Sequence, residues 1–401
     1  MNYNQTENWI LNRLPFYQSQ GSKAYKPGLD NIKSFVDHLN INTQDIKLIH
    51  VGGTNGKGST CAYLSSIIQE SGYRVGTFTS PHFFDYRERI KVNNNKIEKD
   101  FISQFIINNR DIIEKLELTF FELSFGMSLS YYIEKNVDYA IIEVGLGGRL
   151  DATNIIMPEG CLITNISLDH QQFLGTTRAE IAREKAGIIK SKIPVVVVEN
   201  DAETFPVFKT IAQEKNASLH LASQRQFTTD LLGDYQKQNI NGVVSLLHVL
   251  PQFSVSELHI IDGLQRVVKN TGLRGRWEIL ENQPKIIADV AHNPAGLQAV
   301  FAQLKKEQSD KLHIIFGVVS DKKVSEITTF LPKKAHYYLC TANVPRAMNT
   351  SELAFEFIKN DFSFSTHDSV QQAFEAAKTA ASKNDLIFVG GSLFVVAEIL
   401  A

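Results

Sequence analysis

Several features are scarce in this sequence of 401 residues, and each scarcity excludes a class of protein. The three cysteines, Cys61, Cys161 and Cys340, are widely separated, which excludes a disulfide framework and a zinc site built from thiolates. The longest aliphatic run, near residues 195–198, is far below the roughly 20 residues that a membrane helix needs. The start MNYNQTENWILNRL resembles neither a signal peptide nor a transit peptide. We therefore expect a cytoplasmic protein that makes no membrane contact.

An excess of either charge is also absent. Lys and Arg total 41 against 43 Asp and Glu, a net charge of −2, which argues against a basic nucleic-acid-binding surface and against an acidic disordered tail. The hydrophobic share of 43% and the charged share of 21% are ordinary for globular proteins. A chain of this length exceeds the size at which one hydrophobic core stops growing, so we expect two domains.

Short β-branched runs alternate with longer helical patterns, which predicts an α/β fold with parallel sheets covered by helices. In the first part, strands are expected at 47–51, 74–79, 139–144, 162–166 and 194–198, with helices at 57–70, 99–117, 235–250 and 254–268. The polar, glycine-bearing run at 269–275 suits a linker. Beyond it, strands are expected at 286–290, 313–317, 337–340 and 386–389, with helices at 294–307 and 370–382. We predict a first domain at 1–270 and a smaller, Rossmann-like α/β domain at 275–401.

The run IHVGGTNGKGST passes from an expected strand into an expected helix through a glycine-rich turn. Glycines allow close backbone approach, a helix start offers unpaired N–H groups, and Lys57 adds a positive charge, so this turn suits a nucleotide phosphate. It departs from G-x-x-x-x-G-K-[ST], because Val51 replaces the first glycine and Gly58 follows the lysine. The alternative is an ordinary strand-to-helix turn. The candidate ATP ligands in this run are Asn55, Gly56, Lys57, Gly58, Ser59 and Thr60.

The run GTNGKGST resembles the phosphate loop of the Mur-type amide ligases. Further motifs narrow the resemblance to the folylpolyglutamate synthase and dihydrofolate synthase branch, in this order: TSPHFFDYRERI, FFELSF, EVGLGGRLDATN, ITNISLDHQQFLG, REKAGIIK, GDYQKQN and DVAHNP. The resemblance implies a Mur-ligase-like P-loop ATPase domain followed by a glutamate-ligase domain. It implies an ATP-dependent ligase that adds L-glutamate to dihydropteroate, to folates or to both, through an acyl phosphate. Its implied cofactors are ATP as co-substrate, Mg²⁺ at two sites and a monovalent cation, and we expect a monomer.

Glu143 closes the apolar run DYAIIEV, at the strand end where open α/β sheets place ligands. A carboxylate there suits Mg²⁺, which takes a few hard oxygen ligands and completes its shell with water and phosphate. The resemblance adds Ser80 and His170 as metal ligands; on the residues alone, Ser80 is as readily a turn cap and His170 a capping or core residue. It also implies that Lys185, by itself an exposed helical lysine, is carbamylated and approaches a second metal ion. We predict this carbamate.

The resemblance assigns further contacts with the nucleotide and the reaction centre to Asn239, Arg276, Asp289 and His292. An amide matches the edge of adenine, a guanidinium matches phosphate, and a carboxylate matches ribose hydroxyls. Without the resemblance, Asn239 would be a solvent-facing helix residue and Arg276 part of a surface ion pair. Tyr235 receives no role, because the family commonly has histidine there.

The pterin-type substrate is assigned to three places. These are an early loop with Pro27, Gly28 and Leu29, the residues Phe121, Glu122 and Leu123 before an expected helix, and Asp151 in a loop that would face a cleft. Aromatic residues at helical spacing are more often core than ligand contacts. The run GLGGRL is no dinucleotide fingerprint, because Leu150 stands where the last glycine belongs.

Two alternative functions remain. A cell-wall Mur ligase would use the same chemistry, although no separate UDP-binding domain is evident before the phosphate loop, which begins only after residue 50. A nucleotide-binding module without catalysis would keep Gly56 and Lys57 but would not need Glu143, His170 and Lys185 together.

Overall fold

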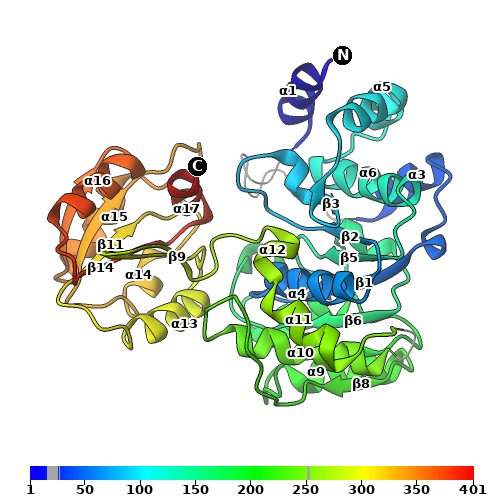
Figure 1. Ribbon diagram of the computed structural model, residues 1–401. Coiled ribbons are helices and arrows are strands. Elements are labelled where there is room, and N and C mark those ends of the chain that lie inside the picture. Colours follow the sequence, from blue (N-terminus) through cyan, green and yellow to red (C-terminus); the bar gives the residue numbers. More distant parts are fainter. Residues whose placement is uncertain (16–25, 27, 251–252) are drawn as a thin grey trace. The chain divides into compact units, whose positions relative to one another are not determined.

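The computed structural model describes residues 1–15, 26, 28–250 and 253–401. The chain forms two compact units (Figure 1). The first contains Met1–Asp230 and Gln236–Gly272, and the second contains Leu231–Tyr235 and Leu273–Ala401. The segment Leu231–Tyr235, which the sequence analysis assigned to the first domain, therefore packs with the second unit.

The first unit is built around an eight-stranded sheet in the order β4-β3-β2-β5-β1-β6-β7-β8. The parallel strands are β1 (Lys47–Gly52), β2 (Val75–Phe78), β5 (Tyr139–Glu143), β6 (Gly160–Ile163), β7 (Val195–Val197) and β8 (Leu219–Leu221). The antiparallel edge strands are β3 (Ile90–Val92) and β4 (Asn95–Lys96). All five predicted strands are present, with ends that differ by a few residues. The prediction missed β3, β4 and β8, because these strands are two or three residues long and partly exposed.

Helices cover this sheet, and the predicted helix at 57–70 is confirmed without change as α4. Helix α4 packs against α10, α11 and α12, and Figure 1 shows α4 beside α11. The helix predicted at 254–268 is instead two helices, and α12 extends into the predicted linker before Gly272 ends it with a φ of 65°. The helices are α1 (Tyr3–Arg13), α3 (Asp30–His38), α4 (Lys57–Glu70), α5 (Lys99–Lys115), α6 (Phe120–Glu134), α7 (Gln171–Leu174), α8 (Arg178–Ala186), α9 (Phe205–Glu214), α10 (Gln236–Val249), α11 (Glu257–Gln265) and α12 (Val267–Thr271).

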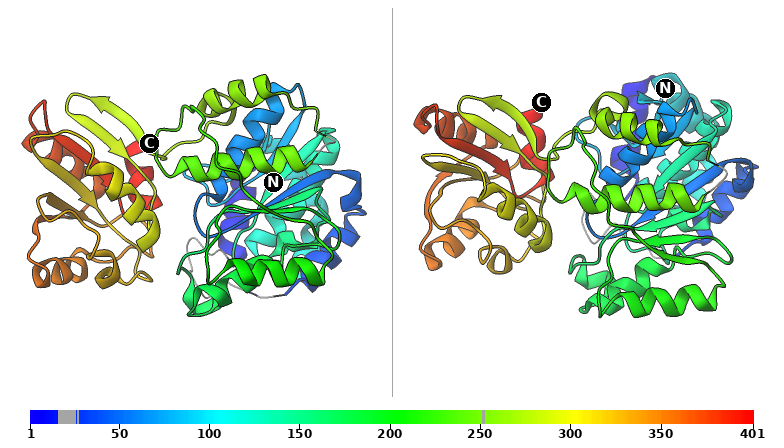
Figure 2. Two further views of the ribbon diagram at one scale, coloured as in Figure 1. Left: turned by 90° about the horizontal axis from the view of Figure 1, so that it is seen from below. Right: turned by 60° about the horizontal axis from the view of Figure 1, so that its bottom comes forward.

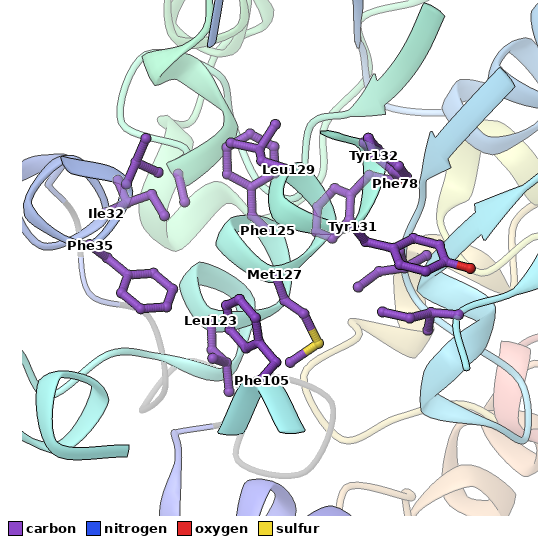
Figure 3. Close-up of a cluster of buried hydrophobic side chains, with 14 of the residues drawn as sticks. Ile32, Phe35, Phe78, Phe105, Leu123, Phe125, Met127, Leu129, Tyr131 and Tyr132 are labelled. Atoms are coloured by element: carbon purple, nitrogen blue, oxygen red, sulfur yellow. The ribbon is translucent and has the colours of Figure 1, made fainter. Parts of the chain in front are cut away.

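Helix α6 supplies much of a hydrophobic cluster of this unit, where its side chains meet those of α3, α5 and β2 (Figure 3). The Phe78 ring lies 5.3 Å from Phe125 and 5.4 Å from Phe121. Burying one such ring contributes about 1.5–3 kcal/mol. Because α6 begins at Phe120, the expectation that residues 121–123 precede a helix is wrong: they form its first turn.

The second unit contains a six-stranded sheet in the order β13-β12-β11-β14-β10-β9, parallel except for the edge strand β9. Helices lie along this sheet in the views of Figure 2, with α15 and α16 against β12 and β13. The four predicted strands and two predicted helices are present, whereas β9, β13, α14, α15 and α17 were missed. The elements are β9 (Glu278–Asn282), β10 (Lys285–Ala288), α13 (Pro294–Leu304), β11 (Leu312–Phe316), α14 (Val324–Ile327), β12 (His336–Cys340), α15 (Thr350–Lys359), β13 (Ser363–His367), α16 (Val370–Ala380), β14 (Leu386–Gly390) and α17 (Leu393–Leu400).

The predicted α/β class, with two parallel-dominated sheets, is confirmed. Within the described ranges, none of the helices combines the length and apolar character required to span a membrane.

Candidate active site

The glycine-rich run forms a turn between β1 and α4, as predicted. Gly56 is the N-cap of α4, with a φ of 84° and no side chain capping the helix. The N–H groups of the first turn of α4 therefore remain available to an anion. The hydroxyl oxygen Oγ1 of Thr60 is buried and has no hydrogen-bond partner among the described residues. A buried polar atom without a partner is costly, so this end of α4 is suited to a bound polar group such as a phosphate.

Two glycines of the turn permit contacts that a side chain would prevent. A Cβ atom at Gly53 would lie 1.8 Å from Oγ1 of Thr164, and one at Gly56 would lie 2.3 Å from Oδ1 of Asn239. Asn239 is 6% exposed, so the expectation from residue type alone, a solvent-facing asparagine, is wrong. It lies against Gly56 of the phosphate loop, and its contact with adenine stays a prediction.

Gln236 is a member of this site that the sequence analysis missed. Its amide nitrogen donates to the Ser59 hydroxyl at 3.2 Å, and its carbonyl oxygen accepts from the Asn239 amide at 2.8 Å. Helix α10 is thereby attached to the first turn of α4. Gln236 stands three residues before Asn239, on the same face of a helix, and this spacing was the signal available in the sequence.

Two lysines converge on the carbonyl oxygen of Gly53. Nζ of Lys57 donates to this oxygen and to that of Thr54, both at 3.1 Å, and Nζ of Lys185 donates to the Gly53 oxygen at 2.8 Å. Lys185 is 4% exposed, contrary to the exposed position expected from residue type alone. Burial, and secondarily the charge of Lys57, lowers the pKa of Lys185 to about 7. Near neutral pH, much of this amine is therefore unprotonated.

The structure brings two of the three predicted metal ligands together. Glu143 ends β5, pairs in register with Val51 and is 3% exposed. Its Oε2 accepts the Ser80 backbone N–H at 2.8 Å. The third, His170, precedes α7 with a φ of 49°, and its Nε2 lies 3.9 Å from Oδ2 of Asp169.

The donor chemistry of these residues is compatible with magnesium. In the described part of the chain, no three His, Cys, Asp or Glu side chains form a metal-binding group. A site with one carboxylate, one hydroxyl and one imidazole would leave several positions to water and nucleotide phosphates, as Mg²⁺ commonly requires. The donor types of Glu143, Ser80 and His170 therefore agree with magnesium, and their joint binding of an ion stays a prediction.

The loop at 145–153 is organised by Asp151, which is 5% exposed. Its carboxylate accepts from the backbone of Leu146 at 2.8 Å and from the backbone and hydroxyl of Thr153 at 3.0 and 2.5 Å. Asp151 is therefore buried and bonded within its own loop, and its contact with the substrate stays a prediction. The loop also packs on α8, where the Arg149 N–H donates to the Glu184 carbonyl at 2.8 Å. This contact places the loop against the helix that carries Lys185.

The remaining substrate candidates have different surroundings. Phe121 is half-buried and lies against Gly145, where a Cβ atom would be 2.5 Å from its ring. Glu122 and Thr119 form a capping box at the start of α6, in which the side chain of each accepts the backbone N–H of the other. Leu123 is completely buried in the core. Gly28 and Leu29 are half-buried before α3, whereas Pro27 lies outside the described residues. Of these positions, Phe121 is the one that the structure brings to the loop of Asp151.

In the second unit, Asp289 is the centre of a buried hydrogen-bond group. Its carboxylate accepts from the Tyr235 hydroxyl at 2.5 Å and from the backbone N–H groups of Trp277 and Ala291 at 2.8 and 2.9 Å. Burial raises the pKa of Asp289, although the hydrogen bond from Tyr235 opposes this change. Tyr235, which received no role from the sequence, is thus a direct partner of a predicted ATP ligand.

The two neighbouring candidates of this unit are half-buried. Nη1 of Arg276 donates to the carbonyl oxygen of Gly275 at 3.2 Å, and Nδ1 of His292 lies 3.0 Å from the carbonyl oxygen of Val290. Val290 follows Asp289 directly in the sequence, and the Gly275 carbonyl accepts the N–H of Val290. Both side chains therefore contact backbone groups close to Asp289.

Comparison with protein families identifies the class. Residues 51–260 match the family described as "Mur ligase middle domain", and residues 275–393 match "Mur ligase, glutamate ligase domain". The chain is thus a Mur ligase, a class of ATP-dependent enzymes that form amide bonds.

Curated relatives define the branch. The dihydrofolate synthase/folylpolyglutamate synthase of Buchnera aphidicola subsp. Schizaphis graminum is 36% identical over 94% of this chain and 90% of its own length. That of Bacillus subtilis is 31% identical over 99% of this chain and 98% of its own length. A probable bifunctional folylpolyglutamate synthase/dihydropteroate synthase of Haloferax volcanii is 31% identical over 99% of this chain, which spans only 50% of that protein. The chain belongs to the dihydrofolate synthase/folylpolyglutamate synthase family.

Solved structures of this family have the same fold. The structure described as E. coli FolC in complex with DHPP and ADP is 28% identical, has a TM-score of 0.86 and is matched over 100% of this chain and 97% of its own. A bifunctional folylpolyglutamate synthase/dihydrofolate synthase with Mn, AMPPNP and L-glutamate bound is 28% identical, with a TM-score of 0.87 and the same coverage.

Proposed function

We propose that this ligase uses ATP and Mg²⁺ to join L-glutamate to dihydropteroate, to a reduced folate or to both. The γ-phosphoryl group of ATP is transferred to a substrate carboxylate, and the glutamate amine then displaces phosphate to form the amide. The observation that carries the proposal is the uncapped start of α4, with Lys57 and Lys185 converging on Gly53. The ligands of the structural relatives, which include ADP, DHPP, AMPPNP, Mn and L-glutamate, support the same reaction.

The residues of the phosphate loop act by positioning and by charge neutralisation. The N–H groups at the start of α4 hold phosphate oxygens, and Lys57 turns from the Gly53 carbonyl toward the transferring phosphoryl group. Glu143, Ser80 and His170 would hold the magnesium ion, which neutralises phosphate charge when it is bound. Asn239 contacts the adenine. Phe121 and Asp151 orient the substrate heterocycle, together with Pro27, Gly28, Leu29, Glu122 and Leu123.

The carbamate of Lys185 forms part of this proposal. Its unprotonated amine attacks CO₂, an N–C bond forms and one proton is released. The product is an anion in place of a neutral amine, and it would be able to approach a second metal ion. The low pKa and the burial of Lys185 support this step.

In the second unit, Arg276 and Asp289 are proposed nucleotide ligands, and His292 is a proposed participant in the reaction. A monovalent cation as additional cofactor, a monomeric state and a cytoplasmic location also remain predictions from the sequence.

Incorporation of radiolabelled glutamate tests the function, with dihydropteroate and tetrahydrofolate offered separately in the presence of ATP and Mg²⁺. We expect product with at least one of them, and phosphate release that depends on the pterin substrate. Lys57→Ala should abolish both signals, whereas Lys209→Ala, which removes an exposed lysine on α9, should retain them.

Two results would contradict the proposal. ATP binding without substrate-stimulated phosphate release would favour a nucleotide-binding module. Turnover with UDP-linked peptides, but with neither pterin substrate, would favour a cell-wall ligase.

A further inference from the structure

Three buried side chains form a hydrogen-bond chain behind the loop at 145–153. His50 lies on β1 and is completely buried, and its Nε2 is 2.9 Å from Oγ1 of Thr153. Thr153 is also completely buried, and its Oγ1 lies 2.5 Å from Oδ1 of Asp151. None of these three hydrogen-bonded residues belongs to the predicted metal or phosphate site. No role was predicted for His50 or Thr153 from the sequence.

The directions of these hydrogen bonds follow from counting protons. A threonine hydroxyl has one proton, and an ionised carboxylate can only accept. If the hydroxyl of Thr153 donates to Asp151, it must accept from His50, which requires a proton on Nε2. Burial lowers the pKa of His50 to about 3, so the ring is neutral and carries a single N–H. Nδ1 of His50 is buried without a partner among the described residues, which is less costly for an unprotonated nitrogen than for an N–H.

The chain connects two functional segments. One residue separates His50 from Gly52, where β1 ends and the phosphate turn begins. At the other end, Asp151 holds the loop through the Leu146 N–H and begins the 3₁₀-helix η4 (Ala152–Ile155). The orientation of the Asp151 carboxylate is therefore determined from β1, the strand that presents the phosphate loop.

We propose that His50 and Thr153 are positioning residues, which fix the Asp151 carboxylate and its loop for binding of the heterocyclic end of the acid substrate. This inference rests on the proposed function, in which Asp151 serves the pterin-type substrate. The two residues do not touch the substrate in this proposal. They act through Asp151 by the direction His50 Nε2–H to Thr153 Oγ1 and Thr153 O–H to Asp151 Oδ1.

A matched pair of variants tests this role. Thr153→Val keeps the shape of the side chain but removes the hydroxyl, so His50 and Asp151 each lose a buried partner; Thr153→Ser keeps the hydroxyl. We expect Thr153→Val to raise KM for the pterin substrate that wild type uses, dihydropteroate or tetrahydrofolate, about tenfold, with KM for ATP and for glutamate changed less than twofold. Thr153→Ser should restore a KM near that of wild type.

Other kinetic results would overturn the inference. Unchanged KM values in Thr153→Val would do so, as would an equal loss in all three substrates together with a lower melting temperature. If wild type itself makes no product from dihydropteroate or tetrahydrofolate, the proposed function fails and the positioning role fails with it. An active wild type with an unaffected Thr153→Val variant removes only the positioning role.

The tautomer of His50 can be measured in wild type, independently of turnover and of the folding of any variant. ¹⁵N-histidine NMR of the full chain should show the His50 ring protonated at Nε2 and unprotonated at Nδ1. A ring protonated at Nδ1 would reverse the hydrogen bond to Thr153 and overturn the inference.

Discussion

Replacing Lys185 by methionine should stabilise the protein while it abolishes activity, and the gain should depend on pH. Burial and the neighbouring Lys57 lower the pKa of Lys185 from 10.5 to about 7. A shift of this size corresponds to about 5 kcal/mol of cost for carrying the buried charge, and this figure is an upper limit for a site that relaxes. Methionine has a similar length and no charge, so Lys185→Met removes that cost. It also removes the hydrogen bond to the Gly53 carbonyl, which contributes about 1 kcal/mol.

The sign of the pH dependence follows from the protonation of Lys185 in the folded and in the unfolded chain. Below pH 7, both the folded and the unfolded chain carry the Lys185 proton, so the folded protein bears the full cost. Above pH 7, the folded protein releases the proton while the unfolded chain retains it up to about 10.5. The free energy of unfolding of wild type therefore rises by about 1.4 kcal/mol per pH unit relative to Lys185→Met. Between pH 6 and pH 9, the advantage of the variant should shrink by about 3 kcal/mol.

Urea unfolding at pH 6, 7, 8 and 9 measures this difference. The buffers must be free of carbonate, because a carbamate would remove the titrating amine. The lost hydrogen bond shifts the level of the difference but not its slope, so the slope is the decisive quantity. Lys209→Met, at an exposed position on α9, controls for the loss of one positive charge. A difference between Lys185→Met and wild type that does not change with pH would refute the reasoning.

Two further predictions concern the phosphate turn and the buried carboxylate of Asp289. Gly56→Ala should abolish ATP binding in calorimetry, because its Cβ atom would lie 2.3 Å from Oδ1 of Asn239. The control is Gly72→Ala, where the φ of 87° is similar but no atom lies within 4 Å of the added Cβ atom. This control should lower the free energy of unfolding by only about 1–2 kcal/mol and bind ATP normally. Equal ATP affinity in both variants would contradict this. Tyr235→Phe should lower the free energy of unfolding by about 1–3 kcal/mol, because Asp289 loses a buried hydrogen-bond donor; an unchanged urea midpoint would refute this contribution.

The sequence was sufficient wherever a local pattern carries its own signal. Apolar runs predicted the central strands, because strands covered on both faces need apolar side chains throughout. The phosphate turn was predictable from its glycines and lysine. The missed strand β4 has a weak pattern, because both of its residues are exposed. A helix was expected after residue 123, but its start at Phe120 was not, because α6 is buried almost all round and therefore lacks a helical stripe.

By itself, the sequence determined the α/β class, the phosphate turn and, through its ordered motifs, the family. Only the tertiary structure decided which side chains share an environment. It buried Lys185 beside Lys57, attached Gln236 to Ser59, and joined His50 to Asp151 through Thr153. Lys185 and Gly53, Gln236 and Ser59, and His50 and Thr153 are far apart in sequence. Their meeting depends on how strands are ordered in a sheet and which helix lies over each strand end. The pKa of a lysine and the direction of a hydrogen bond depend on that packing, and no local pattern contains it.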